Sequence, residues 1–237
     1  MVRAADLPGA AGVAPAAMRI TADGKVILES SGLRLVFDRG MRAQVFANSG
    51  GRMEPLNAPI GPETPPPQHL RIDGRSVTEF SLDAAPPAAE TIETAHGPGS
   101  RIRLSGIAAL PAGGSIRKSV AVEVYKRYPG TALFRTRYQN AGPQPVKVDS
   151  LVEVAWHLPR TDDLWAFHPR NLKPGEDFLF PVVPGLDLTG ENIVLRPQSG
   201  ADNITGGGLP AVSFMTRRWS VTIGHLLPKV PLLRFPV

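Results

Sequence analysis

Strict alternation of apolar and polar residues over positions 115–154 constrains this chain more than any other feature. The positions that share the apolar side are Val120, Val122 and Val124, then Ala132, Phe134, Thr136 and Tyr138, and then Val146, Val148, Val152 and Val154. A period of two is the signature of half-buried antiparallel strands. We therefore predict three consecutive strands that form a meander, whose apolar faces are covered by a second sheet.

Two short segments separate these three runs. Asn140-Ala141-Gly142-Pro143 lies between the second and the third, and Tyr128-Pro129-Gly130-Thr131 opens the second. Proline presets φ for the second position of a turn, and glycine accepts the positive φ that the third position of a type II turn requires. The tetrapeptide from Tyr128 to Thr131 is thus predicted to be a type II turn.

The remainder of the chain contains further short runs with the sequence pattern of β-strands. Further strands are predicted at residues 18–21, 25–29, 33–37, 42–46, 69–72, 76–82, 101–107, 209–215, 219–225 and 230–237. The strands at residues 209–215 and 219–225 are predicted to form a hairpin around Arg217 and Arg218. Residues 48–68 and 84–89, which are rich in glycine, proline or alanine, are predicted to be loops. No stretch shows the apolar spacing of a helix.

Length and composition support one large all-β domain. The 237 residues are 42% hydrophobic, and the 25 prolines and 24 glycines fall between the short β-like runs. This pattern favours a turn-rich antiparallel β-sandwich over a low-complexity chain. We predict a flexible N-terminal tail over residues 1–17 and a sandwich over residues 18–237. Since no closing turn follows the last strand, we expect the sandwich to be incomplete at the C-terminus.

Charge and residue usage exclude several classes of protein. The net charge of +5 and the pI of 9.9 raise the question of nucleic-acid binding. The lysines and arginines are scattered along strands without interleaved aromatics, however, so we predict no nucleic-acid partner. No apolar run approaches the ~18 residues of a membrane span. The absence of cysteine excludes disulfides and thiol catalysis and permits either redox compartment.

Catalytic and cofactor motifs are not found in the sequence. The five histidines have no metal-ligand spacing, and the three glycines that end at Gly208 are not followed by the residues of a phosphate loop. Asp162, Asp163 and Glu191 are loop carboxylates of the kind that cap turns. We therefore predict no metal, no cofactor and no catalytic residue in this chain.

Aromatic residues in the long segment 158–208, which is predicted to be a loop, indicate a possible binding role. Trp165, Phe167 and His168 can stack on a sugar ring, because aromatic faces cover apolar C–H surfaces. Ordinary packing of the segment onto the sandwich is the simpler interpretation of the same residues. The segment closes with Asp202, Asn203 and the glycines Gly206, Gly207 and Gly208, where a backbone without Cβ atoms can approach another surface closely.

A family resemblance rests on three stretches of sequence. They are YPGTALFRTRYQNAGPQPVKVDSL, FPVVPGLDLTGEN and GGGLPAVSFMTRRWSVTIGHLLPKVPLLRFPV. Together they resemble the N-terminal β-supersandwich domain of the α-galactosidase-like glycosidases of glycoside hydrolase family 36. Residues that fit the family pattern are Gly130, Gly206, Gly207, Gly208, Pro210, Gly224 and His225.

The resemblance implies a function for the whole gene product. In the family the sandwich packs on a (β/α)₈ barrel that carries two catalytic aspartates and hydrolyses α-galactosides without metal or organic cofactor. This chain lacks the barrel, so no catalytic residue is transferred. The implied partners are the barrel of the same gene product, an α-galactoside or related glycan, and a possible second copy. The residues implied to border the sugar are Trp165, Phe167, His168, Asp202, Asn203, Gly206, Gly207 and Gly208.

Two alternatives stay open at this point. The chain can be a free-standing carbohydrate-binding β-sandwich, which requires an exposed aromatic platform. It can also be a catalytic sandwich whose site the sequence does not reveal.

Overall fold

The chain forms two compact units, Met1–Pro159 and Arg160–Val237, and each is described by itself. The computed structural model describes residues 16–61, 66–85, 87–152, 156, 158, 161, 163–167, 179–182, 196–197, 204–205 and 211–224. Every regular element in this described part is a β-strand, which confirms the predicted all-β fold class. The prediction of a single domain over residues 18–237 stays a prediction.

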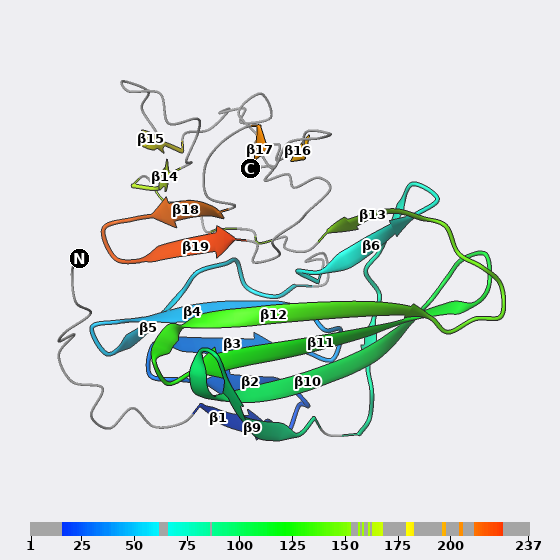
Figure 1. The fold of residues 1–237 in the computed structure, drawn as a ribbon, viewed down its shortest axis with the longest axis horizontal. Coiled ribbons are helices and arrows are strands. Elements are labelled where there is room, and N and C mark those ends of the chain that lie inside the picture. Colours follow the sequence, from blue (N-terminus) through cyan, green and yellow to red (C-terminus); the bar gives the residue numbers. More distant parts are fainter. Residues whose placement is uncertain are drawn as a thin grey trace. The chain divides into compact units, whose positions relative to one another are not determined.

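The first sheet of unit one is a five-stranded antiparallel meander in the order β1-β2-β3-β4-β5 (Figure 1). Its strands are β1 (Ala17–Ile20), β2 (Val26–Glu29), β3 (Leu33–Phe37), β4 (Ala43–Ser49) and β5 (Arg52–Pro55). Val26 lies opposite Phe37 and Leu28 lies opposite Leu35. All four side chains are buried, so one face of this sheet is a continuous apolar layer.

The second sheet has the order β12-β11-β10-β8, and β9 also pairs with β10. Its strands are β8 (Ser81–Leu82), β9 (Ala89–Thr94), β10 (Gly97–Ala109), β11 (Ser115–Tyr125) and β12 (Tyr128–Asn140). The inward positions of β10 and β11 alternate with polar outward positions, as the sequence predicts. A third, three-stranded sheet has the order β13-β6-β7, from β6 (His69–Ile72), β7 (Arg75–Val77) and β13 (Val148–Val152).

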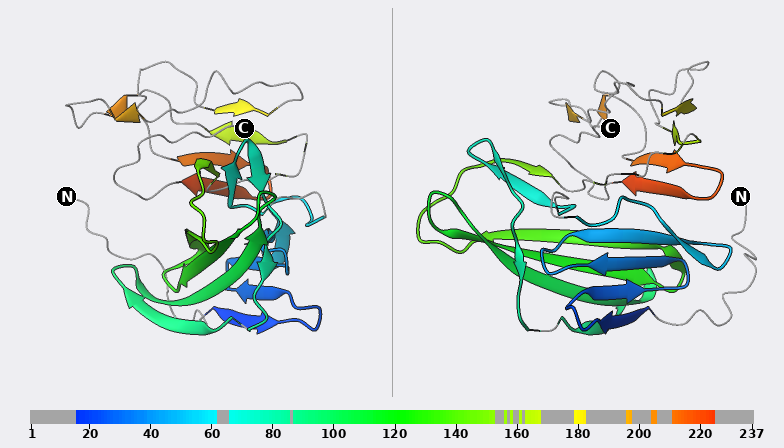
Figure 2. Two further views of the ribbon diagram at one scale, coloured as in Figure 1. Left: turned by 90° about the vertical axis from the view of Figure 1, so that its right-hand side faces the viewer. Right: turned by 180° about the vertical axis from the view of Figure 1, so that it is seen from behind.

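The core of unit one lies between the first two sheets and includes residues of the third. β10, β11 and β12 lie in front of β2 and β3 in Figure 1, and behind them in the reverse view of Figure 2. Phe37, Leu35, Ile102, Leu104 and Val122 are each at most 1% exposed in this cluster. Burying one such side chain contributes roughly 1.5–3 kcal/mol to the stability of the fold. This is the second sheet that the sequence predicts as a cover, and unit one is accordingly a β-sandwich.

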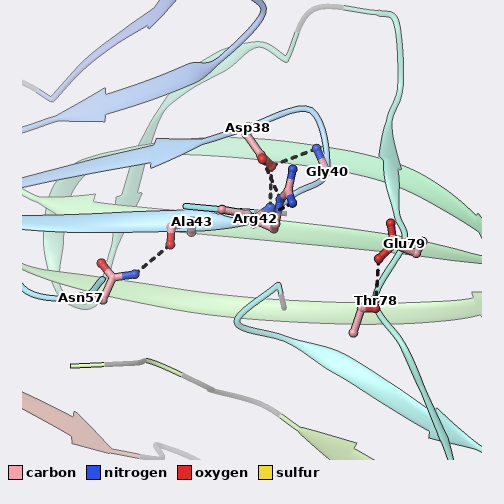
Figure 3. A network of polar contacts seen from close by, with 8 residues as sticks. Asp38, Gly40, Arg42, Ala43, Asn57, Thr78 and Glu79 are labelled. Carbon is pink, nitrogen blue, oxygen red and sulfur yellow. Dashed lines mark hydrogen bonds and ion pairs between the residues drawn. The ribbon is translucent and has the colours of Figure 1, made fainter. Parts of the chain in front are cut away.

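The turn between β3 and β4 carries one residue of the core. The Asp38 carboxylate accepts hydrogen bonds from the backbone N–H groups of Gly40 and Arg42, both at 2.9 Å, and from the Arg42 guanidinium at 2.7 Å (Figure 3). Met41 between them has a φ of +57° and is 1% exposed. A left-handed conformation is unfavourable for a non-glycine residue, so the Asp38 contacts and the burial of Met41 hold it in place.

The predicted type II turn from Tyr128 to Thr131 is wrong. Tyr128, Pro129 and Gly130 belong to β12, Gly130 does not have a positive φ, and Lys126 and Arg127 form the turn instead. Because β12 lies at the edge of its sheet, the missing N–H of a proline there removes no necessary ladder bond. The segment packs against the β2–β3 turn, where the Ser30 hydroxyl donates to the Pro129 carbonyl at 2.5 Å.

The predicted meander of three strands over residues 115–154 is wrong in its last member. β13 pairs with β6, which lies far back in the sequence, and the true meander is β10-β11-β12. A bulge between Val148 and Ser150 shifts the register of β13, and Val148 is 45% exposed. The expected burial of Val148 therefore does not occur, since an edge strand that is bulged presents side chains to solvent on both sides. Val154 lies outside the described residues.

Several boundaries also differ from the prediction. The predicted loop 48–68 contains β5, which forms a hairpin with β4 through Gly50 and Gly51, both at positive φ. The predicted strand 76–82 is split into β7 and β8, and residues 101–107 are the centre of the much longer β10. Alternation over two or three residues is too short to predict where such strands begin and end, so their bounds depend on the strands with which they pair.

Unit two contains a four-stranded antiparallel sheet in the order β15-β14-β18-β19 and a two-stranded sheet. Its strands are β14 (Trp165–Phe167), β15 (Leu179–Pro181), β16 (Arg196–Pro197), β17 (Ile204–Thr205), β18 (Ala211–Met215) and β19 (Ser220–Gly224). The predicted hairpin around Arg217 and Arg218 is confirmed as β18–β19. His225 and the predicted strand 230–237 lie outside the described residues.

Candidate functional site

Trp165 and Phe167 lie on a strand, not on a loop as predicted. They begin and end β14, an inner strand of its sheet that pairs with β15 on one side and β18 on the other. Ala166 between them is fully buried. Successive side chains of a strand point to opposite faces, so the two aromatic residues project together from the exposed face, about 7 Å apart along the strand.

The register of the sheet shows what surrounds these two side chains. Trp165 lies opposite Met215, which lies opposite Ser220, and Phe167 lies opposite Ser213, which lies opposite Thr222. We call these six residues the aromatic face. Trp165 is 41% and Phe167 is 37% exposed, whereas Phe214 on the other face is buried. β14, β18 and β19 run side by side in Figure 1.

Polar groups accompany the aromatic residues on this face. The Ser213 and Thr222 hydroxyls are 2.7 Å apart and hydrogen-bonded on the exposed side of the β18–β19 hairpin. A sugar offers both C–H faces and hydroxyls, so aromatic rings next to serine and threonine hydroxyls meet both kinds of surface. Such a face can bind a flat, uncharged ligand and has no group suited to proton transfer.

Asp163 fixes the start of β14 to the hairpin turn. Its carboxylate accepts a hydrogen bond from the backbone N–H of Arg217 at 3.1 Å. This hydrogen bond is the main cause that lowers the pKa of the Asp163 carboxyl below its ordinary value. Asp163 thus caps a turn, as the sequence predicts for these acids, and holds Trp165 next to the hairpin. Asp162 and Glu191 lie outside the described residues.

The other predicted sugar-bordering residues are not placed by the structure. His168, Asp202, Asn203, Gly206, Gly207 and Gly208 lie outside the described residues. The structure therefore brings Trp165 and Phe167 together and leaves the rest of the predicted set as a prediction. Ser213, Ser220 and Thr222 were not among the predicted site residues, although their alternation with Phe214, Val221 and Ile223 signals a common exposed face.

A buried polar cluster in unit one is the second chemically unusual place. Lys118 is fully buried, and its Nζ donates to the Gln68 carbonyl at 2.6 Å and lies 5.1 Å from the centre of the Phe80 ring. Burial lowers the pKa of Lys118 to about 7. Within the described residues, the Gln68 side-chain amide has no hydrogen-bond partner. Sequence reasoning missed this cluster, although Lys118 breaks the run of inward apolar residues on β11.

Another buried charge lies on the opposite face of the same sheet. Glu123 is 3% exposed and accepts hydrogen bonds from the Tyr125 hydroxyl at 2.5 Å and from Arg101 Nε at 2.8 Å. Burial alone raises the pKa of Glu123, but these hydrogen bonds and the charges of Arg101 and Arg135 outweigh it and lower the pKa. Gly99 and Tyr125 line a cavity of about 10 Å³, which has room for about one water molecule.

Within the described part of the chain, no group of three or more histidine, cysteine, aspartate or glutamate side chains lies close enough to hold a metal ion. No helix in these residues is long and apolar enough to cross a membrane.

Comparison with known proteins does not assign the chain to a family. No protein-family model, no curated protein and no solved structure matches it. The aromatic face is therefore interpreted from its own geometry.

Proposed function

We propose that this chain is a non-catalytic β-sandwich portion of an α-galactosidase-like glycoside hydrolase, and that its aromatic face contacts the glycan. One observation supports this above all others: Trp165 and Phe167 project side by side from an inner strand and stay more than one-third exposed. Large apolar side chains on an exposed sheet face commonly mark an interaction site. In this proposal the hydrolytic carboxylates belong to a barrel elsewhere in the gene product.

A free-standing carbohydrate-binding module is the second candidate. The pairing of exposed aromatics with the Ser213 and Thr222 hydroxyls favours it, because a complete stacking and hydrogen-bonding surface needs no second domain. In both candidates the chain by itself does not hydrolyse glycosides. Turnover of a chromogenic α-galactoside by the purified chain would instead support a catalytic sandwich.

The test is a titration in which Trp165 is the sole fluorescent tryptophan. Trp156 and Trp219 are replaced by phenylalanine, and α-galactosides and a β-linked galactan are added. The free-standing module predicts a saturable change in emission with the α-galactosides in the isolated chain, whereas the hydrolase domain predicts binding only in the longer gene product. In a second measurement, calorimetry compares Trp165→Ala with Trp219→Ala in the otherwise unchanged chain. Only Trp165→Ala should weaken glycan binding, by about tenfold or more, because it removes an aromatic ring that stacks on the sugar.

Three results separate the candidates. Saturable binding by the isolated chain favours the free-standing module. Binding that requires the longer gene product, and a raised KM there for Trp165→Ala, favours the hydrolase domain. An unchanged KM together with lower stability would mean that Trp165 only packs, and would contradict both.

A further inference from the structure

The outward face of β10, β11 and β12 is rich in arginine. The residues at its alternate positions are Arg101, Arg103 and Ser105 on β10, Arg117, Ser119, Ala121 and Glu123 on β11, and Leu133, Arg135, Arg137 and Gln139 on β12. Their sequence neighbours, such as Ile102, Leu104, Val120 and Val122, point into the core. We call this set the arginine face; it belongs wholly to unit one and is distinct from the aromatic face.

Three of the five arginines have an acidic partner. Arg101 Nη2 lies 2.7 Å from Glu123, Arg103 Nη1 lies 2.5 Å from Glu90, and Arg117 Nη1 lies 2.6 Å from Asp83. These pairs neutralise most of the charge of the three arginines. The positive charge that remains on the face comes from β12.

Arg135 and Arg137 provide this remaining charge. Both are exposed, and neither forms an ion pair with any residue that the structure describes. They are two positions apart on one strand, so their Cα atoms are about 7 Å apart. Two guanidinium groups on the same face thus keep their donors available for a ligand.

The residues that lie opposite these two arginines on β11 have small side chains. Arg135 lies opposite Ala121, which lies opposite Arg103, and Arg137 lies opposite Ser119. The Ser119 and Ser105 hydroxyls are 3.1 Å apart. Arg103 and Arg135 therefore flank an alanine from both sides, with Cα atoms about 10 Å apart. An oxyanion bound by Arg135 and Arg137 therefore meets only the small side chains of Ala121 and Ser119 on the neighbouring strand.

We propose that the arginine face binds an acidic polysaccharide through its carboxylate or sulfate groups. Guanidinium recognises such planar or tetrahedral oxyanions with two parallel hydrogen bonds. A polymer with regularly spaced acids matches several arginines at once, and the net charge of +5 attracts it at long range. A single-stranded nucleic acid fits less well, since none of the residues of the arginine face is aromatic and bases have no ring there on which to stack. The aromatic pair Tyr125 and Tyr128 lies at the turn between β11 and β12, where Tyr125 is buried and Tyr128 is 43% exposed.

Affinity measurements with purified chain test this proposal. The probes are polygalacturonate, which has carboxylates alone, heparin, which also has sulfates, a neutral galactan and single-stranded DNA. The test variant is Arg135→Ala with Arg137→Ala. The matched control is Arg52→Ala with Arg75→Ala, which removes two exposed arginines of unit one from other sheets and changes the net charge equally. Thermal unfolding by circular dichroism verifies that each variant is folded.

We expect one or both acidic polysaccharides to bind, with an affinity that falls as salt is added. The test variant should weaken this binding by roughly tenfold or more, because it removes two charge-assisted contacts. The control should stay within about twofold. Comparison of polygalacturonate with heparin then tells which acid is preferred.

Three results would overturn the proposal. They are no binding to either acidic polysaccharide, equal losses in the two double variants, and tighter binding to single-stranded DNA than to both polysaccharides. The second would reduce the effect to net charge, and the third would assign the face to a nucleic acid.

Discussion

The ammonium group of Lys118 donates a hydrogen bond to the Gln68 carbonyl at 2.6 Å in the interior of unit one. The side chain comes from the centre of β11, at a position where the strand's alternation places valine or isoleucine on either side. Within the described residues no acidic side chain pairs with it. A buried cation without a counter-ion opposes folding, and this makes Lys118 a sensitive point of the fold.

Stability is expected to depend on pH through Lys118. Below about pH 7 the amine is protonated in both folded and unfolded chains, so it contributes no pH dependence. Between about pH 7 and its ordinary pKa of 10.5, the unfolded chain holds a proton that the folded chain lacks. Raising the pH through this window should increase the free energy of unfolding by up to about 1.4 kcal/mol per pH unit. Urea unfolding at several pH values measures the slope.

Lys118→Met tests whether that slope belongs to Lys118. Methionine has a similar length and no charge, so the slope between pH 7 and 10 should disappear. Lys126→Met, in the exposed turn after β11, is the control and should keep it. A slope that survives in Lys118→Met would mean that another group binds the proton.

Gly106→Ala is expected to destabilise unit one. An added Cβ would lie 2.6 Å from the Met41 sulfur and 2.5 Å from the Ser81 carbonyl oxygen, and the latter belongs to the backbone and cannot turn away. Overpacking of this kind costs about 1–3 kcal/mol. Gly130→Ala is the control, because no atom lies within 4 Å of its added Cβ. Denaturant midpoints should fall for the first variant and stay close to the parent value for the second.

Glu123→Gln is expected to lower stability at neutral pH by about 1–3 kcal/mol, because Arg101 loses its closest acidic partner in a buried place. Since the folded-state pKa of Glu123 is lowered, its stabilisation is present above the ordinary pKa of 4.5 and is lost as the pH falls through the folded value. The glutamine variant should therefore lose less stability than the parent chain between neutral and acidic pH. A parallel acid response of both chains would show that Glu123 does not contribute to it.

Trp165→Ala and Phe214→Ala should differ sharply in stability, since the two residues lie on opposite faces of one sheet. Trp165 is 41% exposed, so its truncation should lower the free energy of unfolding only slightly. Phe214 is 5% exposed, and its truncation should lower the free energy of unfolding by about 3–5 kcal/mol. Thermal unfolding compares them. A large loss for Trp165→Ala would assign that side chain to packing, and the glycan proposal would lose its main support.

Local pattern predicted much of the strand content. The bounds of β3 and β6 agree with the sequence-based prediction to the residue, because clear turn residues flank both strands. Trp165 and Phe167 were also predicted as site residues from their type alone. Their common exposed face depends on β14 being a paired strand, and a three-residue strand carries too little pattern to be predicted.

The sequence by itself determined the period of two, and with it the all-β class and the separation of Val120 and Val122 from Arg135 and Arg137. Those properties follow from a single strand, because alternate side chains point to opposite faces wherever the strand lies. Only the tertiary structure decided that β13 pairs with β6, that Lys118 is buried, and that Arg135 and Arg103 flank Ala121. Pairing across long sequence separations depends on which strands bury each other's apolar faces, and no local pattern contains that information.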